Sequence, residues 1–117
     1  LPATSPLAQL ATATADQVDA IGSALQVHAQ ELAEAAAAYS RLQERAAALG
    51  LIVTDWTVTE PFGLIGSDVA ARRGVERPQV QAQADRLASR LARGRAQLAR
   101  QLAQASQQVA RASAAAR

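Results

Sequence analysis

The 117-residue chain contains no cysteine, no methionine and no lysine, and it has one histidine, one tryptophan, one tyrosine and one phenylalanine. Without cysteine there is no disulfide framework and no thiolate metal site, and a single histidine cannot form a histidine cluster. We therefore predict that the chain holds no metal and no cofactor. Alanine dominates what is present, with 31 residues, and leucine follows with 13.

Long apolar runs are also missing, and we expect no targeting signal. No apolar stretch approaches the roughly 18 residues that a membrane-spanning helix needs, so we expect no membrane span. Residues 1–4 lack a basic region followed by an apolar core, and we therefore expect no cleavable signal peptide. The chain starts with Leu1 rather than methionine, which suggests a processed product or a part of a longer protein.

The first half of the chain has the seven-residue repeat of a helix that packs against another helix. Ser5 is a favourable N-cap, and Pro6 is tolerated at the first helical position. Apolar or small residues then recur in steps of three and four up to Leu49, and Gly50 is a suitable terminating residue. The spacing predicts a helix over about residues 6–49. Its packing seam includes Val18, Ile21, Leu25, His28, Leu32 and Tyr39.

Residues 50–77 follow a different pattern. The segment 51–59 is rich in β-branched residues, which favour extended chain. A single helical turn over residues 69–73 is the only helix that we expect here. We therefore predict a structured connector rather than a tight turn or a flexible linker. Proline and glycine interrupt it at Pro61, Gly63, Gly66 and Gly74.

The three-four spacing returns after Pro78 and predicts a second helix over about residues 78–115. Gly94 falls on its seam, although glycine costs about 1 kcal/mol relative to alanine in a helix. Close approach of a neighbouring helix is the best explanation for a glycine there. The seam of this helix includes Leu87, Leu91, Gly94, Leu98 and Leu102.

Two long helices joined by a connector predict an all-α fold, an antiparallel helical hairpin that forms a single domain over residues 1–117. Two helices alone make a thin core, and many seam positions here are alanine. Each helix would leave part of its apolar stripe exposed. We therefore expect a partner hairpin, a second copy or a different chain, that completes a four-helix bundle.

Charge is distributed unevenly along the chain. Residues 1–68 carry a net charge of −6 and residues 69–117 a net charge of +8. Such asymmetry suggests an interaction role. At 100° per residue, five arginines of the second helix fall within about 80° and form a basic stripe. It could contact nucleic acid, acidic lipid or an acidic partner, but we favour a solvated face beside an acidic helix, because no aromatic residue is interleaved for base stacking. The stripe consists of Arg86, Arg90, Arg93, Arg100 and Arg111.

The remaining candidates have structural explanations. We interpret His28 as a structural seam residue whose protonation would loosen a buried bundle. Trp56 and Phe62 either plug the open end of the hairpin or form a recognition knob, and the sequence favours neither.

The connector offers no nucleophile–base pair, and its Gly63–Gly66 segment is too short for a phosphate loop. We therefore do not expect an enzyme.

Two segments resemble a known family, the WXG-type helical hairpins exported by actinobacterial type VII (ESX) secretion systems. PFGLIGSDVAA (61–71) looks like the connector of the secretion-associated members. EAAAAYSRLQE (34–44) looks like the helix around the family's Tyr-x-x-x-Asp/Glu export motif, although Gln43 stands at the fourth position after Tyr39. Trp56 is followed by Thr57 and Val58 where the family has Trp-x-Gly. The resemblance implies hairpins that dimerise into four-helix bundles and are exported as folded pairs, with a secretion chaperone as a further partner.

The sequence therefore predicts a non-enzymatic protein-interaction module, a dimerising hairpin that is secreted by, or associated with, a type VII secretion system. It would form a homodimer, or a heterodimer with another hairpin, and would be secreted or in the cell envelope. Two alternatives stay open. One is a helical protein, in the cytoplasm, that binds nucleic acid or an acidic surface through the basic stripe. The other is a coiled-coil segment of a larger structural protein.

Overall fold

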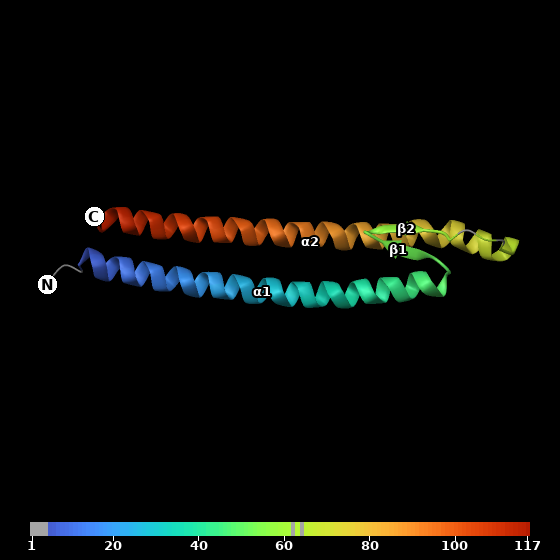
Figure 1. The fold of residues 1–117 in the computed structure, drawn as a ribbon, viewed down its shortest axis with the longest axis horizontal. Helices are drawn as coiled ribbons and strands as arrows, with labels where there is room; N and C mark the ends of the chain where they lie inside the picture. The colour runs from blue at the N-terminus through green and yellow to red at the C-terminus, as the bar shows by residue number, and fades with distance from the viewer. Residues whose placement is uncertain (1–4, 62, 64) are drawn as a thin grey trace. The chain divides into compact units, whose positions relative to one another are not determined.

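The computed structural model describes residues 5–61, 63 and 65–117. Over these residues the elements follow in the order α1 (Pro6–Ala48), β1 (Ile52–Thr54), β2 (Thr57–Thr59) and α2 (Ser67–Ala115) (Figure 1). The chain is an all-α antiparallel helical hairpin with two short strands in its connector. The predicted fold class is confirmed, while the four-helix bundle stays a prediction.

The contacts within the chain divide it into two compact units. Unit 1 is Leu1–Glu31 with Gly94–Arg117, and unit 2 is Leu32–Arg93. Each unit contains one segment of α1 and one of α2. The single domain over residues 1–117 therefore remains a prediction, and the two units are described separately below.

Helix α1 has the two ends that its sequence predicts. At the N-terminus, the Ser5 hydroxyl accepts a hydrogen bond from the Ala8 amide at 3.1 Å. At the C-terminus, Gly50 has a φ of 71°, the region that glycine adopts without strain. The Leu51 amide donates to Ala46 at 2.7 Å and the Gly50 amide to Ala47 at 2.9 Å, the bond pair of a Schellman motif. These caps explain why α1 ends within one residue of its predicted limit.

The β-branched segment forms a tight β-hairpin rather than a single extended strand. β1 and β2 pair antiparallel, with Val53 opposite Val58. Asp55 and Trp56 make the two-residue turn, with φ values of 49° and 67°, as a type I′ turn requires. Val53 and Val58 are buried while their strand neighbours are exposed. The β-hairpin therefore presents one apolar face to the helix segments of unit 2.

The predicted connector over residues 50–77 is too long, because α2 begins at Ser67 rather than near residue 78. The single turn predicted over residues 69–73 is the first part of this helix, and both Gly74 and Pro78 lie inside it. Pro78 has no amide hydrogen to donate to the carbonyl of Gly74, so the helix loses one bond there. Asp68 in the first turn is favourable for the helix dipole.

Contacts to other parts of unit 2 hold this early segment of α2 in place. Arg73 Nε donates to the Leu49 carbonyl at 3.0 Å. Glu76 forms an ion pair with Arg45 at 3.0 Å, and Arg77 lies 3.7 Å from Glu60. These contacts offset the two helix-breaking residues, and no local sequence pattern reveals them.

The two units differ in how much they bury. Unit 2 has an apolar core in which both helices and the β-hairpin meet, with Tyr39 and Leu49 packed against it. In the described part of unit 1, the only buried residue is Ala105. Unit 2 therefore holds the core of the hairpin. That core consists of Leu42, Ala46, Leu51, Val53, Val58, Val80 and Ala84.

Candidate functional site

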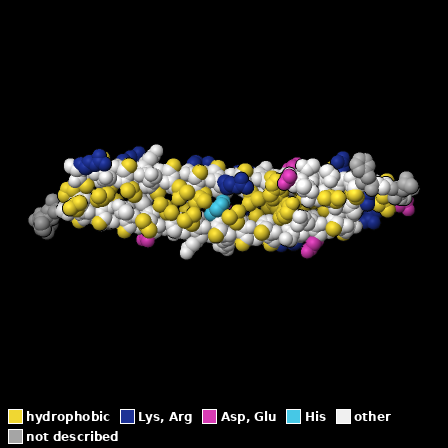
Figure 2. Space-filling model, viewed as in Figure 1, with side chains coloured by type: hydrophobic (Ala, Val, Ile, Leu, Met, Phe, Trp, Pro, Cys, Tyr) yellow, Lys and Arg dark blue, Asp and Glu magenta, His cyan; other side chains and the backbone are white. Residues whose placement is uncertain are grey.

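The seam residues predicted for unit 1 are largely open to solvent. Val18 is 62% exposed, Leu25 47% and Leu102 37%. Figure 2 shows apolar side chains at the surface beside the histidine ring. We call Val18, Leu25 and Leu102 the exposed seam of unit 1. The other predicted seam residues of this unit are half-buried, namely Ile21, His28, Gly94 and Leu98.

His28 lies against α2 at the point where Gly94 leaves room for it. A Cβ atom added to Gly94 would lie 3.8 Å from the His28 ring and 3.1 Å from the Glu31 carboxylate. Gly94 thus allows close approach, as its seam position predicts. The Nδ1 atom of His28 is buried, lies 4.0 Å from a Glu31 oxygen and has no hydrogen-bond partner among the described residues. The loosening that we expect from protonation of His28 stays a prediction.

In unit 2 the β-hairpin covers part of the predicted seam. The rings of Tyr39 and Trp56 meet edge to face, with centroids 5.0 Å apart and an interplanar angle of 65°. Tyr39, Leu87 and Leu91 are half-buried, whereas Leu32 is exposed. Leu32 lies seven positions before Tyr39, about two helical turns along α1.

Trp56 lies in the turn and is half-buried. Gln81 holds the turn in place, because its Nε2 donates to the Trp56 carbonyl and its Oε1 accepts from the Val58 amide, both at 2.8 Å. This packing favours the structural interpretation of Trp56 over a recognition knob. Phe62 lies outside the described residues. Gly63 and Gly66 are exposed, and the Gly66 carbonyl accepts the first bond of α2 from the Ala70 amide at 3.0 Å.

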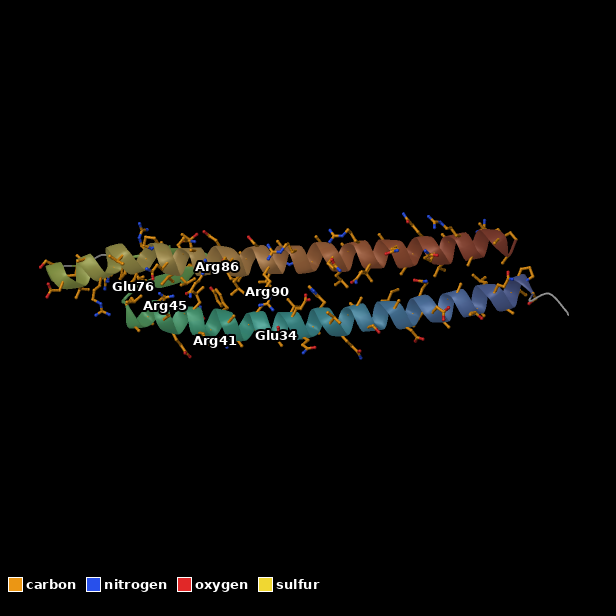
Figure 3. The ribbon with its side chains drawn as sticks, turned by 180° about the vertical axis from the view of Figure 1, so that it is seen from behind. Glu34, Arg41, Arg45, Glu76, Arg86 and Arg90 are labelled. Carbon is orange, nitrogen blue, oxygen red and sulfur yellow. The ribbon has the colours of Figure 1, made fainter. Side chains whose placement is uncertain are left out.

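Four arginines of unit 2 line a groove between its two helix segments. Figure 3 shows Arg41 and Arg45 on α1, and Arg86 and Arg90 on α2. Both helices supply the same pattern, Arg-Leu-x-x-Arg, at residues 41–45 and 86–90. We call this the arginine groove. Its volume is about 420 Å³, and it is lined by Ala38, Arg41, Leu42, Arg45, Gln83, Arg86, Leu87 and Arg90.

Two of these four arginines already bind carboxylates of unit 2. Arg45 Nη2 lies 3.0 Å from Glu76, and Arg90 Nη2 lies 3.0 Å from Glu34. Over the residues that the structure describes, neither Arg41 nor Arg86 has a carboxylate oxygen within 4.0 Å. The groove therefore keeps two positive charges that no carboxylate neutralises.

The arginine groove and the β-hairpin lie on different flanks of α1, on either side of Leu42. At 100° per residue, Tyr39 and Arg45 are displaced by about 60° to opposite sides of Leu42. The β-hairpin contacts Tyr39 through Trp56, so it does not cover the flank that carries Arg45. The groove is accessible, and Arg41, Arg86 and Arg90 are exposed.

The basic stripe predicted on α2 contributes only in part to this groove. Arg86 and Arg90 line it, whereas Arg93, Arg100 and Arg111 do not. These three are exposed, and Arg100 donates to Gln97 on its own helix at 3.2 Å. Arg41 and Arg45 are not among the residues predicted from the sequence. The repeated Arg-Leu-x-x-Arg pattern, mirrored across an antiparallel hairpin, was the signal that could have found them.

Neither a metal site nor a membrane-spanning helix is found in the described residues. Over the described residues, no three acidic or histidine side chains are grouped so that they could hold a metal ion. No described helix combines the length and the hydropathy that crossing a membrane requires.

Comparison with known proteins identifies no relative. No protein-family model matches the chain. No curated protein and no solved structure is significantly similar to it. The function therefore has to be argued from the residues of this chain.

Proposed function

We propose that this chain is a non-enzymatic protein-interaction module whose hairpin packs against a second helical hairpin to complete a four-helix bundle. The observation that carries the proposal is the near absence of a core in unit 1. Ala105 is the only buried residue in its described part, while Val18 and Leu25 are about half exposed or more. Two helices of this length gain most of their stability from packing an apolar face, and unit 1 does not bury one.

The spacing of the exposed residues suits helical packing. Val18 and Leu25 are seven residues apart, the repeat with which helices interlock side chains in bundles. Fully burying a valine or leucine contributes about 1.5–3 kcal/mol. Covering the part of each side chain that is now exposed would contribute about 1 kcal/mol per residue. In a pair of hairpins, several such contributions add up to a stable association.

The test is the solution mass of the purified chain by light scattering, with circular dichroism on the same sample. We expect a cooperative, strongly helical dimer. Leu25→Asp should abolish it, because a carboxylate would enter the interface. Gln26→Asp is the matched control, since this exposed residue is one position along and about 100° away. A monomeric wild-type chain with weak helicity would assign the exposed seam to a different hairpin. A fully helical, cooperative monomer would contradict the proposal.

We further propose that the module acts in type VII secretion. This part rests only on the resemblance of residues 34–44 and 61–71 to the WXG-type hairpins. Its test is export of the folded chain into the medium by an actinobacterial host with and without an intact type VII system. Equal amounts in both media would refute this assignment and leave the interaction module in place.

A further inference from the structure

We propose that the arginine groove of unit 2 binds an acidic amphipathic helix of a partner protein. Carboxylates of that helix would face Arg41 and Arg86, and an apolar side chain between them would lie against Leu87 and Ala38. This site is distinct from the exposed seam of unit 1, so it does not depend on the bundle proposed above.

The charges of the groove argue for an anionic ligand. Four arginines line it, and two carboxylates, Glu34 and Glu76, pair with two of them. The guanidinium groups of Arg41 and Arg86 keep their positive charge without such a partner in the described residues. Like charges in one groove repel each other, and a ligand with two negative charges would relieve this. The other two arginines of the groove, Arg45 and Arg90, each hold a carboxylate at 3.0 Å.

The apolar floor argues for a peptide helix rather than a nucleic acid. Leu87 and Ala38 are half-buried and form the accessible part of the floor, whereas Leu42 beneath them is buried in the core of unit 2. A phosphate backbone would leave this floor uncovered. The described lining also contains no aromatic side chain on which a base could stack. A helix with acidic residues around one apolar position matches both the charges and the floor.

The geometry of the groove fits a third helix. Its walls are antiparallel segments of α1 and α2, and the surface ridges of a helix pack into such a groove. Recognition of an amphipathic helix in a groove uses side chains spaced three or four residues apart. The arginines of each wall have the matching spacing of four residues.

The test uses a fluorescent, end-capped 20-residue model helix in which pairs of glutamates flank a leucine. We expect saturable binding, by fluorescence anisotropy, that weakens with salt. The double variant Arg41→Gln/Arg86→Gln should weaken binding about tenfold, because it removes both free charges. Arg93→Gln/Arg100→Gln is the matched control. It removes the same charge from the basic stripe outside the groove, and it should change binding less than twofold. Helicity and Trp56 emission of all variants should equal those of the wild type.

Two altered peptides and one nucleic acid separate the explanations. Replacing the glutamates by glutamine should abolish binding, and replacing the leucine by serine should weaken it. Equal losses in both arginine variants would overturn the proposal in favour of unspecific charge attraction. Tighter binding of a 20-base-pair DNA duplex, lost in Arg41→Gln/Arg86→Gln, would overturn it in favour of a nucleic-acid site. A fall in solution mass in that variant would assign the groove to a second copy of the chain. Failure of the wild type to bind the peptide would also overturn it.

Discussion

Gln81 should determine whether the β-hairpin stays attached to α2. Its side chain donates to the Trp56 carbonyl and accepts from the Val58 amide, each at 2.8 Å. The same amide nitrogen lies 3.0 Å from an Asp85 oxygen, which orients it. Truncation by Gln81→Ala would remove all of these bonds and leave two partly buried backbone groups without their partner.

The expected cost follows from these two bonds. A neutral hydrogen bond contributes about 0.5–1.5 kcal/mol net, so the free energy of unfolding should fall by about 1–3 kcal/mol. The β-hairpin has little stability of its own to compensate. Isolated two-stranded hairpins are marginally stable, and its turn places Asp55 and Trp56 at positive φ, which costs about 1–2 kcal/mol per residue.

The only tryptophan of the chain reports on this event. Trp56 packs on Tyr39, so its release into water should shift its emission to longer wavelength. In a urea titration of Gln81→Ala, we expect Trp56 emission to change at lower denaturant than helicity measured by circular dichroism. Gln43→Ala is the control, since Gln43 is exposed and makes no side-chain hydrogen bond within the described residues. A wild-type midpoint for Trp56 emission in Gln81→Ala would refute the reasoning.

Three glycine substitutions test the backbone interpretation by thermal melting. Gly50→Ala should lower stability by about 1 kcal/mol or more, because its φ of 71° is strained for alanine and an added Cβ would meet the Arg73 guanidinium; an unchanged melting temperature would contradict this. Gly22→Ala should raise stability by up to about 1 kcal/mol, since an added Cβ meets nothing within 4 Å. Gly94→Ala should raise it by less, because the Glu31 carboxylate, 3.1 Å away, has to move. An equal gain at both positions would refute close approach at Gly94.

The helix boundaries illustrate what local sequence can predict. The end of α1 was predictable because Gly50 and the three-four spacing agree on it. The start of α2 was not, because Gly74 and Pro78 locally favour an interruption. Ion pairs and hydrogen bonds to residues far along the chain, such as Glu76 with Arg45, outweigh that preference.

The β-hairpin was only half predictable. The β-branched residues correctly favoured extended chain, and they did so because alternate side chains pack against a core. The turn could not be recognised, since Asp55-Trp56 lacks the glycine that usually identifies a type I′ turn. The contacts of Trp56 with Tyr39 and Gln81 accompany this unfavourable turn.

The candidate site was predictable only on one helix. Periodicity places Arg86 and Arg90 on one face of α2, but Arg41 and Arg45 join them only through the register of the hairpin. Leu25 and Leu102 of the predicted seam are exposed in the single chain, as expected for an apolar stripe that two helices cannot cover alone. A seven-residue repeat indicates which face packs, and it does not say which chain supplies the packing partner.

The two proposed surfaces can be separated, because they belong to different units. Unit 2 has its own core, and its arginines bind through charge, whereas the exposed seam of unit 1 would bind through apolar contact. Leu25→Asp should therefore change solution mass and leave peptide binding in the arginine groove intact. Arg41→Gln/Arg86→Gln should do the reverse. Combining both changes should give additive free-energy effects, as independent sites do. A coupling beyond about 0.5 kcal/mol would mean that bundle formation and the arginine groove share one mechanism.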